Sequence, residues 1–111
     1  MSFKVAVVQD SPVLFNLHST IEKVELLTKK AVNEGAELII FPEAFISAYP
    51  KGLDFGARIG SRTTKGREEF LDYYNSSLEL NSKEFFKLLN IAKENKVFIV
   101  IGVIEKDMGT L

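Results

Sequence analysis

The chain has 111 residues, of which 46% are hydrophobic and 26% are charged, and its net charge is −1. This size and mix are typical of one soluble domain, and the near-neutral charge gives no electrostatic reason to expect nucleic acid or an anionic membrane as a partner. Cysteine is absent, which excludes disulfides, thiolate metal sites and a thiol nucleophile from this sequence.

Targeting and membrane signals are also missing from the sequence. No apolar run approaches the roughly 20 residues that a membrane helix needs. The first ten residues, MSFKVAVVQD, reach an acidic residue at once and lack the apolar core and cleavage site of a signal peptide. We therefore expect a cytoplasmic location and no membrane partner.

The first third of the chain predicts a strand, a helix and a second strand. Residues 3–8 form a short apolar run of the kind found in buried parallel strands. A capping-box spacing that starts at Ser19 predicts a helix, and Gly35 is placed to end it. Residues 38–41 are a second apolar run. Together they predict a βαβ unit with two parallel strands side by side.

Glu43 comes directly after the second predicted strand. Because Pro42 cannot donate to a sheet, the strand should end there, and ligands of open α/β sheets bind just beyond such strand ends. The nearest neighbours of Glu43 include Phe41 and Phe45, so burial should raise the pKa of its carboxyl toward neutrality and suit a general base. Alternatively, Glu43 caps a turn or pairs with a Lys or Arg, and its position alone favours neither role.

A long loop, residues 44–65, follows this carboxylate. Loops of more than about 12–15 residues are usually functional or disordered, and this one is too apolar for disorder. We expect it to pack against the sheet, a substrate or another subunit. Its three glycines do not have the spacing of a dinucleotide or phosphate loop, so we do not expect a nucleotide.

The rest of the chain predicts two helices and one strand. Residues 66–76 suggest a short helix whose aromatic face packs in the core. Asn81 or Ser82 caps the next helix. Its expected buried stripe consists of Phe85, Leu88, Leu89 and Ala92. Residues 97–104 are apolar except for Gly102 and predict a central strand, after which residues 110–111 open another.

The only histidine is His18, and we expect it on the surface at the start of a helix. A metal site or a Ser-His-Asp triad would need partners for this ring that the sequence does not indicate. We therefore expect no metal site and no cofactor.

Seven short motifs are spread along the chain: VAVVQ at 5–9, FPEAF at 41–45, YPKG at 49–52, FG at 55–56, GSR at 60–62, GREEF at 66–70 and IGVIE at 101–105. Together they resemble the nitrilase branch of the carbon–nitrogen hydrolase superfamily. FPE alone indicates the broad superfamily, which includes amidases and carbamoylases. The run of YPKG, FG and GSR is narrower and points to nitrilases.

The resemblance implies a four-layer α-β-β-α sandwich, of which residues 1–111 are the N-terminal part of one domain, incomplete at its C-terminal end. It implies conversion of a nitrile to a carboxylate and ammonia by a Glu, a Lys and a Cys. Glu43 matches the Glu, which acts as general base, and Tyr49 is a candidate substrate-binding residue. No residue matches the Lys or the Cys. The aromatic face of residues 66–76 then borders a subunit interface in a homo-oligomer.

Three interpretations stay open. The chain is the N-terminal segment of a nitrilase-like hydrolase, inactive alone and completed by a further C-terminal chain, with a small nitrile or amide as substrate. Alternatively, it is a non-catalytic assembly or binding module, or a remnant, that pairs with a nitrilase subunit. Without the resemblance, it is a small α/β ligand-binding domain. Part of a sandwich would expose an apolar sheet face and unpaired strand edges, so we expect the isolated chain to self-associate.

Overall fold

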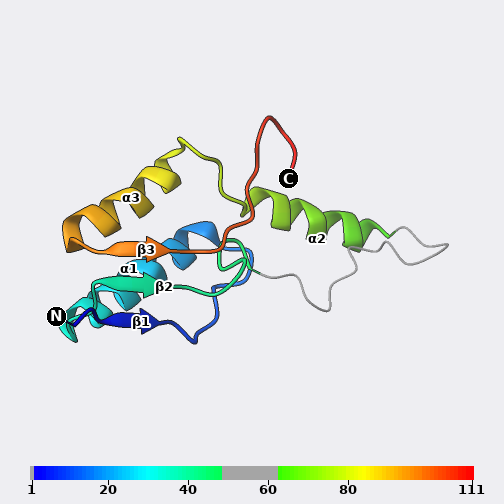
Figure 1. Ribbon diagram of the computed structural model, residues 1–111. Helices are drawn as coiled ribbons and strands as arrows, with labels where there is room; N and C mark the ends of the chain where they lie inside the picture. Colours follow the sequence, from blue (N-terminus) through cyan, green and yellow to red (C-terminus); the bar gives the residue numbers. More distant parts are fainter. Residues whose placement is uncertain (1, 49–62) are drawn as a thin grey trace.

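The computed structural model describes residues 2–48 and 63–111 (Figure 1). Strands and helices alternate along the chain, as expected for an α/β protein. The elements in order are β1 (Val5–Val7), α1 (Leu17–Asn33), β2 (Leu38–Ile40), α2 (Thr64–Asn75), α3 (Lys83–Asn95) and β3 (Phe98–Val100). No helix in the described ranges combines the length and the apolar character needed to cross a bilayer.

The three strands form one parallel sheet in the order β1-β2-β3. The predicted pairing of the first two strands is confirmed, with Ala6 beside Ile39 and Ile39 beside Ile99. The prediction that residues 97–104 form a central strand is wrong for this sheet, because β2 is in the middle and β3 is at an edge. An apolar run favours burial of a strand but carries no information about strand order, and the outer residues of β1 and β3, such as Val7 and Phe98, are in fact exposed.

β3 is also shorter than the apolar run that predicted it. Regular pairing with β2 ends at Val100. Beyond it, the chain forms two isolated parallel bridges to residues outside β2, from Val103 to Ile46 and from Glu105 to Leu78. The interruption arises because the chain after β2 turns away from β3 and returns to it a few residues later. No strand is found at residues 110–111, where Thr110 instead closes a tight turn by hydrogen bonds with Asp107.

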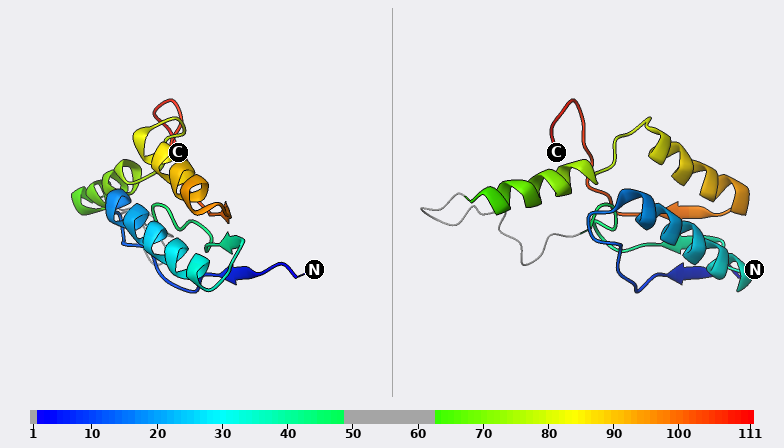
Figure 2. Two further views of the ribbon diagram at one scale, coloured as in Figure 1. Left: turned by 90° about the vertical axis from the view of Figure 1, so that its left-hand side faces the viewer. Right: turned by 180° about the vertical axis from the view of Figure 1, so that it is seen from behind.

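One face of the sheet is covered by α1 and α3, which pack against each other on the same side of the strands (Figure 2, left). Residues at the middle register of the strands face these helices, and Ile39 there is completely buried. The surrounding core comes from both helices and from the segment after β2. Its buried residues are Ile21, Val24, Ala36, Ile39, Phe41, Phe45, Ile46, Leu78, Leu88 and Ile91.

The opposite face of the sheet has no covering element in the described chain (Figure 2). Two rows of apolar side chains are in register across it. They are Val5, Leu38 and Phe98 in one row, and Val7, Ile40 and Val100 in the other. Phe98 is 73% exposed and Val7 is 67% exposed, so this face is open to solvent. The exposed apolar face expected from a partial sandwich is therefore confirmed.

The ends of α1 follow local capping rules. The helix begins at Leu17, because the side chain of Asn16 accepts a hydrogen bond from the Ser19 amide at 3.0 Å. The predicted start near Ser19 is therefore two residues late. Gly35 has φ +92° after the last turn, which confirms its predicted role in ending the helix.

α3 begins after Ser82, whose hydroxyl accepts from the Phe85 amide at 3.2 Å, so Ser82 rather than Asn81 is the cap. Its buried residues are Leu88 and Ile91. Leu89, which was expected in the buried stripe, is exposed, because the buried face of α3 is centred on Leu88 and Ile91.

α2 points away from the sheet (Figure 1) and is capped by Thr63. Its aromatic face contacts the rest of the chain through Tyr73, whose ring centroid lies 5.8 Å from that of Phe15. Burial there raises the pKa of the Tyr73 hydroxyl. Phe70 is exposed, so the predicted packing of this whole face in the core is wrong.

Candidate functional site

Glu43 lies in a turn directly after β2, at the carboxyl end of the parallel sheet. Two backbone hydrogen bonds to the path of β3 bracket this turn. The Phe41 amide donates to the Val100 carbonyl at 2.8 Å, and the Ile46 amide donates to the Gly102 carbonyl at 3.2 Å. Residues 42–45 therefore form a turn between two fixed points, and the predicted place of Glu43 beyond the strand is confirmed.

The apolar neighbours of Glu43 anchor this turn in the hydrophobic core. Phe45 and Ile46 are completely buried, and the rings of Phe41 and Phe45 pack with their centroids 5.3 Å apart. Glu43 itself is exposed. The burial that the sequence predicted around this carboxylate is therefore wrong for this chain. In a turn, side chains close in sequence point in different directions, and here the aromatic rings take the inward ones.

The backbone of the turn lies directly on Gly102, in the segment that continues β3. A Cβ atom at Gly102 would be 2.5 Å from the amide nitrogen of Ala44 and 2.8 Å from the Cα of Glu43. Ala44 has φ +47°, a left-handed conformation that is unfavourable for a residue with a side chain. The turn is thus tightly packed and conformationally restricted.

Further contacts hold the segment after the turn. The Ala48 amide donates to the Ala44 carbonyl at 3.1 Å, and the Phe15 amide donates to the Ser47 carbonyl at 3.3 Å. The Ser47 hydroxyl donates to the Tyr73 carbonyl at 3.5 Å. The segment preceding α1 and the end of α2 therefore both form hydrogen bonds with Ser47, a few residues after Glu43.

The alternative role of Glu43 was an ion pair or a cap. Three ion pairs occur within residues 2–48 and 63–111, and none involves Glu43. They join His18 to Glu22, Lys23 to Asp10, and Lys29 to Glu25. In this part of the chain, the Glu43 carboxylate also accepts no hydrogen bond from a backbone amide, as the side chain of a cap would.

The other candidate residue, Tyr49, lies outside the described residues, as do the YPKG and GSR motifs. His18 is exposed in the first turn of α1, where its Nε2 lies 3.1 Å from Glu22 Oε1, and this confirms its predicted surface position. Within the described ranges, no three His, Cys, Asp or Glu side chains are grouped closely enough to hold a metal ion.

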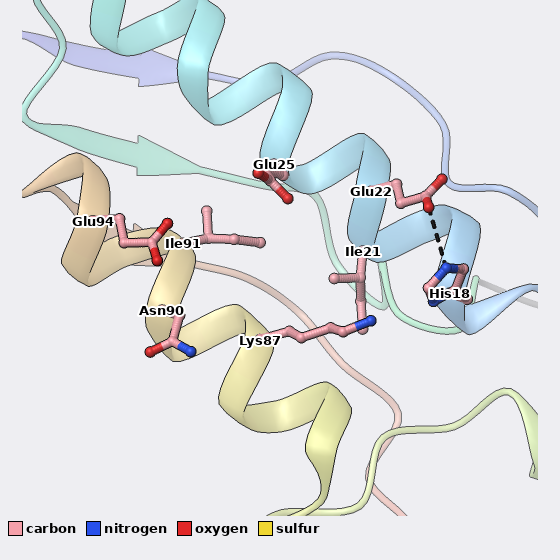
Figure 3. Close-up of a pocket in the computed structure, with 8 residues that line it drawn as sticks. All are labelled: His18, Ile21, Glu22, Glu25, Lys87, Asn90, Ile91 and Glu94. Carbon is pink, nitrogen blue, oxygen red and sulfur yellow. Dashed lines mark ion pairs between the residues drawn. The ribbon is translucent and has the colours of Figure 1, made fainter.

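Two grooves lined entirely by described residues lie away from Glu43. A polar groove of about 290 Å³ runs between α1 and α3 (Figure 3), with Ile21 and Ile91 beside charged side chains. An apolar groove of about 270 Å³ lies between α3 and the segment that continues β3. Neither contains a residue of the Glu43 turn. Sequence reasoning did not predict these grooves, because each depends on the packing of α3 against distant parts of the chain.

Gly102 is the feature of the site that sequence reasoning missed. Its only signal was that it interrupts an otherwise apolar run of eight residues, 97–104. A glycine inside a strand often marks a close approach of another backbone, and that is what the structure shows.

Comparison with known proteins identifies similar sequences. The profile of the carbon–nitrogen hydrolase family matches residues 4–111. A bifunctional nitrilase/nitrile hydratase of Nicotiana tabacum is 44% identical over 108 residues, which are 97% of this chain and 31% of the relative. An arylacetonitrilase of Trametes versicolor is 44% identical over 99% of this chain and 35% of its own length. An aliphatic nitrilase of Sinorhizobium fredii is 45% identical over 98% of this chain and 35% of its own length. The chain spans about a third of these curated relatives.

Proposed function

This chain belongs to the carbon–nitrogen hydrolase family, and we propose that it is the N-terminal segment of a nitrilase-like hydrolase in which Glu43 is the general base. The observation that carries the proposal is the Glu43 turn. It places a carboxylate that has no ion partner among residues 2–48 and 63–111 at the carboxyl end of a parallel sheet, on a backbone anchored to β3 at both ends. The similarity to nitrilases of plant, fungal and bacterial origin over nearly the whole chain supports the assignment.

The proposed reaction converts a nitrile and two molecules of water to a carboxylate and ammonium. A cysteine thiol attacks the nitrile carbon, and Glu43 takes the thiol proton, because a thiol becomes a strong nucleophile only as the thiolate. A lysine ammonium stabilises the negative charge that develops on the substrate nitrogen. This chain contains no cysteine, so the thiol comes from the sequence or subunit that completes the site. We assign none of its lysines to the cationic role.

We propose that the completing part covers the exposed apolar face of the sheet with a second sheet, which gives a four-layer α-β-β-α sandwich. The two apolar rows on that face support this arrangement, because each square ångström of apolar surface removed from water contributes about 25 cal/mol. The same covering part would enclose the end of the sheet where Glu43 lies. Removal of water from the carboxylate would then make it a stronger base.

The proposed substrate class is a nitrile. The relatives include an arylacetonitrilase and an aliphatic nitrilase, so both kinds of substituent occur among proteins that match this chain over nearly its full length. Other relatives are bifunctional nitrilase/nitrile hydratases, so an amide is a second possible product of the completed enzyme.

The test is a hybrid enzyme in which this chain replaces the matching third of the Sinorhizobium fredii nitrilase. We expect the hybrid to release ammonia from a nitrile, and Glu43→Gln to lower the single-turnover rate about 10²–10⁴-fold, the usual contribution of a general base. Glu43→Asp withdraws the carboxylate by one methylene and should lose about 10²-fold. The matched control is Glu37→Gln, because Glu37 is an exposed carboxylate at the other end of β2, and its rate should be unchanged.

A folded hybrid that keeps its rate after Glu43→Gln would show that Glu43 is structural. The isolated chain should release no ammonia from the same nitrile, because it has no thiol. Turnover by the pure chain that disappears in Glu43→Gln would refute the need for an external cysteine.

A second candidate function is a non-catalytic module that pairs with a nitrilase subunit, either in a homo-oligomer or with a different chain. The exposed sheet face and the absence of cysteine both favour it. An inactive but well-folded hybrid, together with tight binding of the isolated chain to an intact nitrilase subunit, would support this function over catalysis.

A further inference from the structure

We propose that Gly102 is a positioning residue that sets the location of the Glu43 carboxylate, an inference that rests on the proposed role of Glu43 as the base. Gly102 lies beneath the Glu43 turn and has no side chain that could contact substrate. It would act by allowing the turn to lie directly on the backbone that continues β3.

The space above Gly102 is filled by backbone atoms of the turn. A Cβ at this position would lie 2.5 Å from Ala44 N, 2.8 Å from Glu43 Cα and 2.9 Å from the Glu43 carbonyl carbon, whereas ordinary contacts are 3.4–4 Å. Because all three atoms belong to the main chain, no side-chain rotation relieves the overlap. An alanine would therefore push the turn outward by about 1 Å, the difference between the shortest of these distances and an ordinary contact.

The requirement at Gly102 is for space and not for an unusual backbone conformation. Gly35 and Gly109 have positive φ angles, but Gly102 does not. Alanine at 102 is thus compatible with the local backbone, and the three nearest atoms that exclude its Cβ all belong to the Glu43 turn. Gly35 is the opposite case, because its φ is +92° and a Cβ there would meet only a Lys4 side chain, at 3.7 Å. The two glycines therefore form a matched pair for experiment.

The rest of the turn is held in place, so the displacement would fall on Glu43. The Ile46 amide is hydrogen-bonded to the Gly102 carbonyl, and the Ile104 amide is hydrogen-bonded to Ile46. Phe45 and Ile46 are completely buried. With one side of the turn bonded to β3 and the buried Ala44, Phe45 and Ile46 anchored in the core, the exposed Glu43 is the part of the turn that is able to move. A displacement of about 1 Å in a catalytic group lowers rates about 10²-fold.

The test is a double-mutant cycle in the hybrid enzyme described above, measured by single-turnover rate and by KM. Gly102→Ala should lower kcat about 10²-fold with little change in KM when Glu43 is present. In the Glu43→Gln background there is no base to displace, so the same substitution should lower the remaining rate less than about 3-fold, because effects acting through one group are not additive. Gly35→Ala should lower the thermal midpoint but change the rate by the same factor in both backgrounds.

Equal losses from Gly102→Ala in both backgrounds would overturn the proposal, since Gly102 would then act only through the fold. A full rate in Glu43→Gln alone would refute the role of Glu43 itself, and the cycle separates that result from a failure at Gly102. If Gly102→Ala does not fold, Ala44→Gly is added, because glycine adopts φ +47° without strain and lets the turn shift. A folded double variant with full kcat would equally overturn the proposal.

Discussion

Glu43 is exposed although the residues on both sides of it in the sequence are apolar. The turn directs Phe41 and Phe45 into the core and leaves the carboxylate between them on the outside. At the same site, Gly102 provides room for the backbone and Ala44 accepts a left-handed conformation. Residues that contact no substrate in the proposed reaction therefore determine where its base lies.

A buried hydroxyl gives a prediction at the same scale. Thr28 is completely buried in α1, and its Oγ1 has no hydrogen-bond partner in the part of the chain that the structure describes. Thr28→Val exchanges this hydroxyl for a methyl group of similar shape, so we expect the free energy of unfolding to rise by about 1 kcal/mol. Urea unfolding followed by circular dichroism, at one protein concentration, measures the change.

The matched control is Thr20, which is also completely buried in α1. Its hydroxyl donates to the Val13 carbonyl at 3.0 Å and accepts from the Val13 amide at 3.1 Å. Thr20→Val should therefore lower the free energy of unfolding by about 1–3 kcal/mol. Equal losses in the two variants would mean that the Thr28 hydroxyl is paired as well.

Among the elements, the two helices that cover the sheet owe their starts to local side chains. Asn16 and Ser82 each accept a hydrogen bond from an amide in the first turn. Their ends differ, because α1 is followed by a glycine with positive φ, whereas α3 ends at Lys96 with φ +54°. A lysine in a left-handed conformation is strained by about 1–2 kcal/mol.

Lys96→Gly should relieve this strain. We expect the free energy of unfolding to rise by about 0.5–1 kcal/mol, since the greater freedom of glycine in the unfolded chain offsets part of the gain. Lys93→Gly, inside the last turn of the same helix, is the control and should destabilise by about 0.5–1 kcal/mol. Thermal unfolding measures the stability of both variants. A loss of stability in Lys96→Gly would show that the Lys96 side chain stabilises the fold by more than its left-handed conformation costs.

The molecule as a whole is a sheet with one covered face and one open face. α1 and α3 shield one side, while two apolar rows on the other side are open to solvent in the described chain (Figure 2). Large exposed apolar patches are typical of surfaces that bind a protein, a membrane or a ligand. The architecture therefore agrees with a chain that spans about a third of its relatives' length.

We expect the isolated chain to self-associate through this face. Phe98→Lys places a charge at its most exposed position and should shift light scattering toward monomer. Phe86→Lys is the control, because Phe86 is an exposed aromatic residue on α3 rather than on the sheet. In the hybrid enzyme, Phe98→Lys should instead lower stability, since the completed fold would bury that charge. A monodisperse wild-type monomer with one sharp unfolding transition would favour an independent small α/β domain.

Local patterns in the sequence were sufficient for the described helices and strands and for the position of Glu43 along the chain, although they also predicted a strand at residues 110–111 that does not form. Apolar runs predicted the strands, cap residues predicted the helix ends to within a few residues, and Pro42 predicted the end of β2 just before Glu43. These features depend on hydrogen bonds and side-chain directions within a few residues of one another. The resemblance to nitrilases, which the matches to the family and its relatives confirm, also depends on short motifs.

Only the tertiary structure decided which side chains are buried and which backbones touch. The edge position of β3 and the contact of Gly102 with the Glu43 turn both depend on segments more than fifty residues apart in the chain. The exposure of Glu43 depends on which side chains of the turn are taken into the core. Burial is a property of every atom around a group, and most of those atoms belong to distant residues. A carboxylate beside phenylalanines in the sequence can therefore face water, and a glycine in an apolar run can lie directly against the turn that holds this carboxylate.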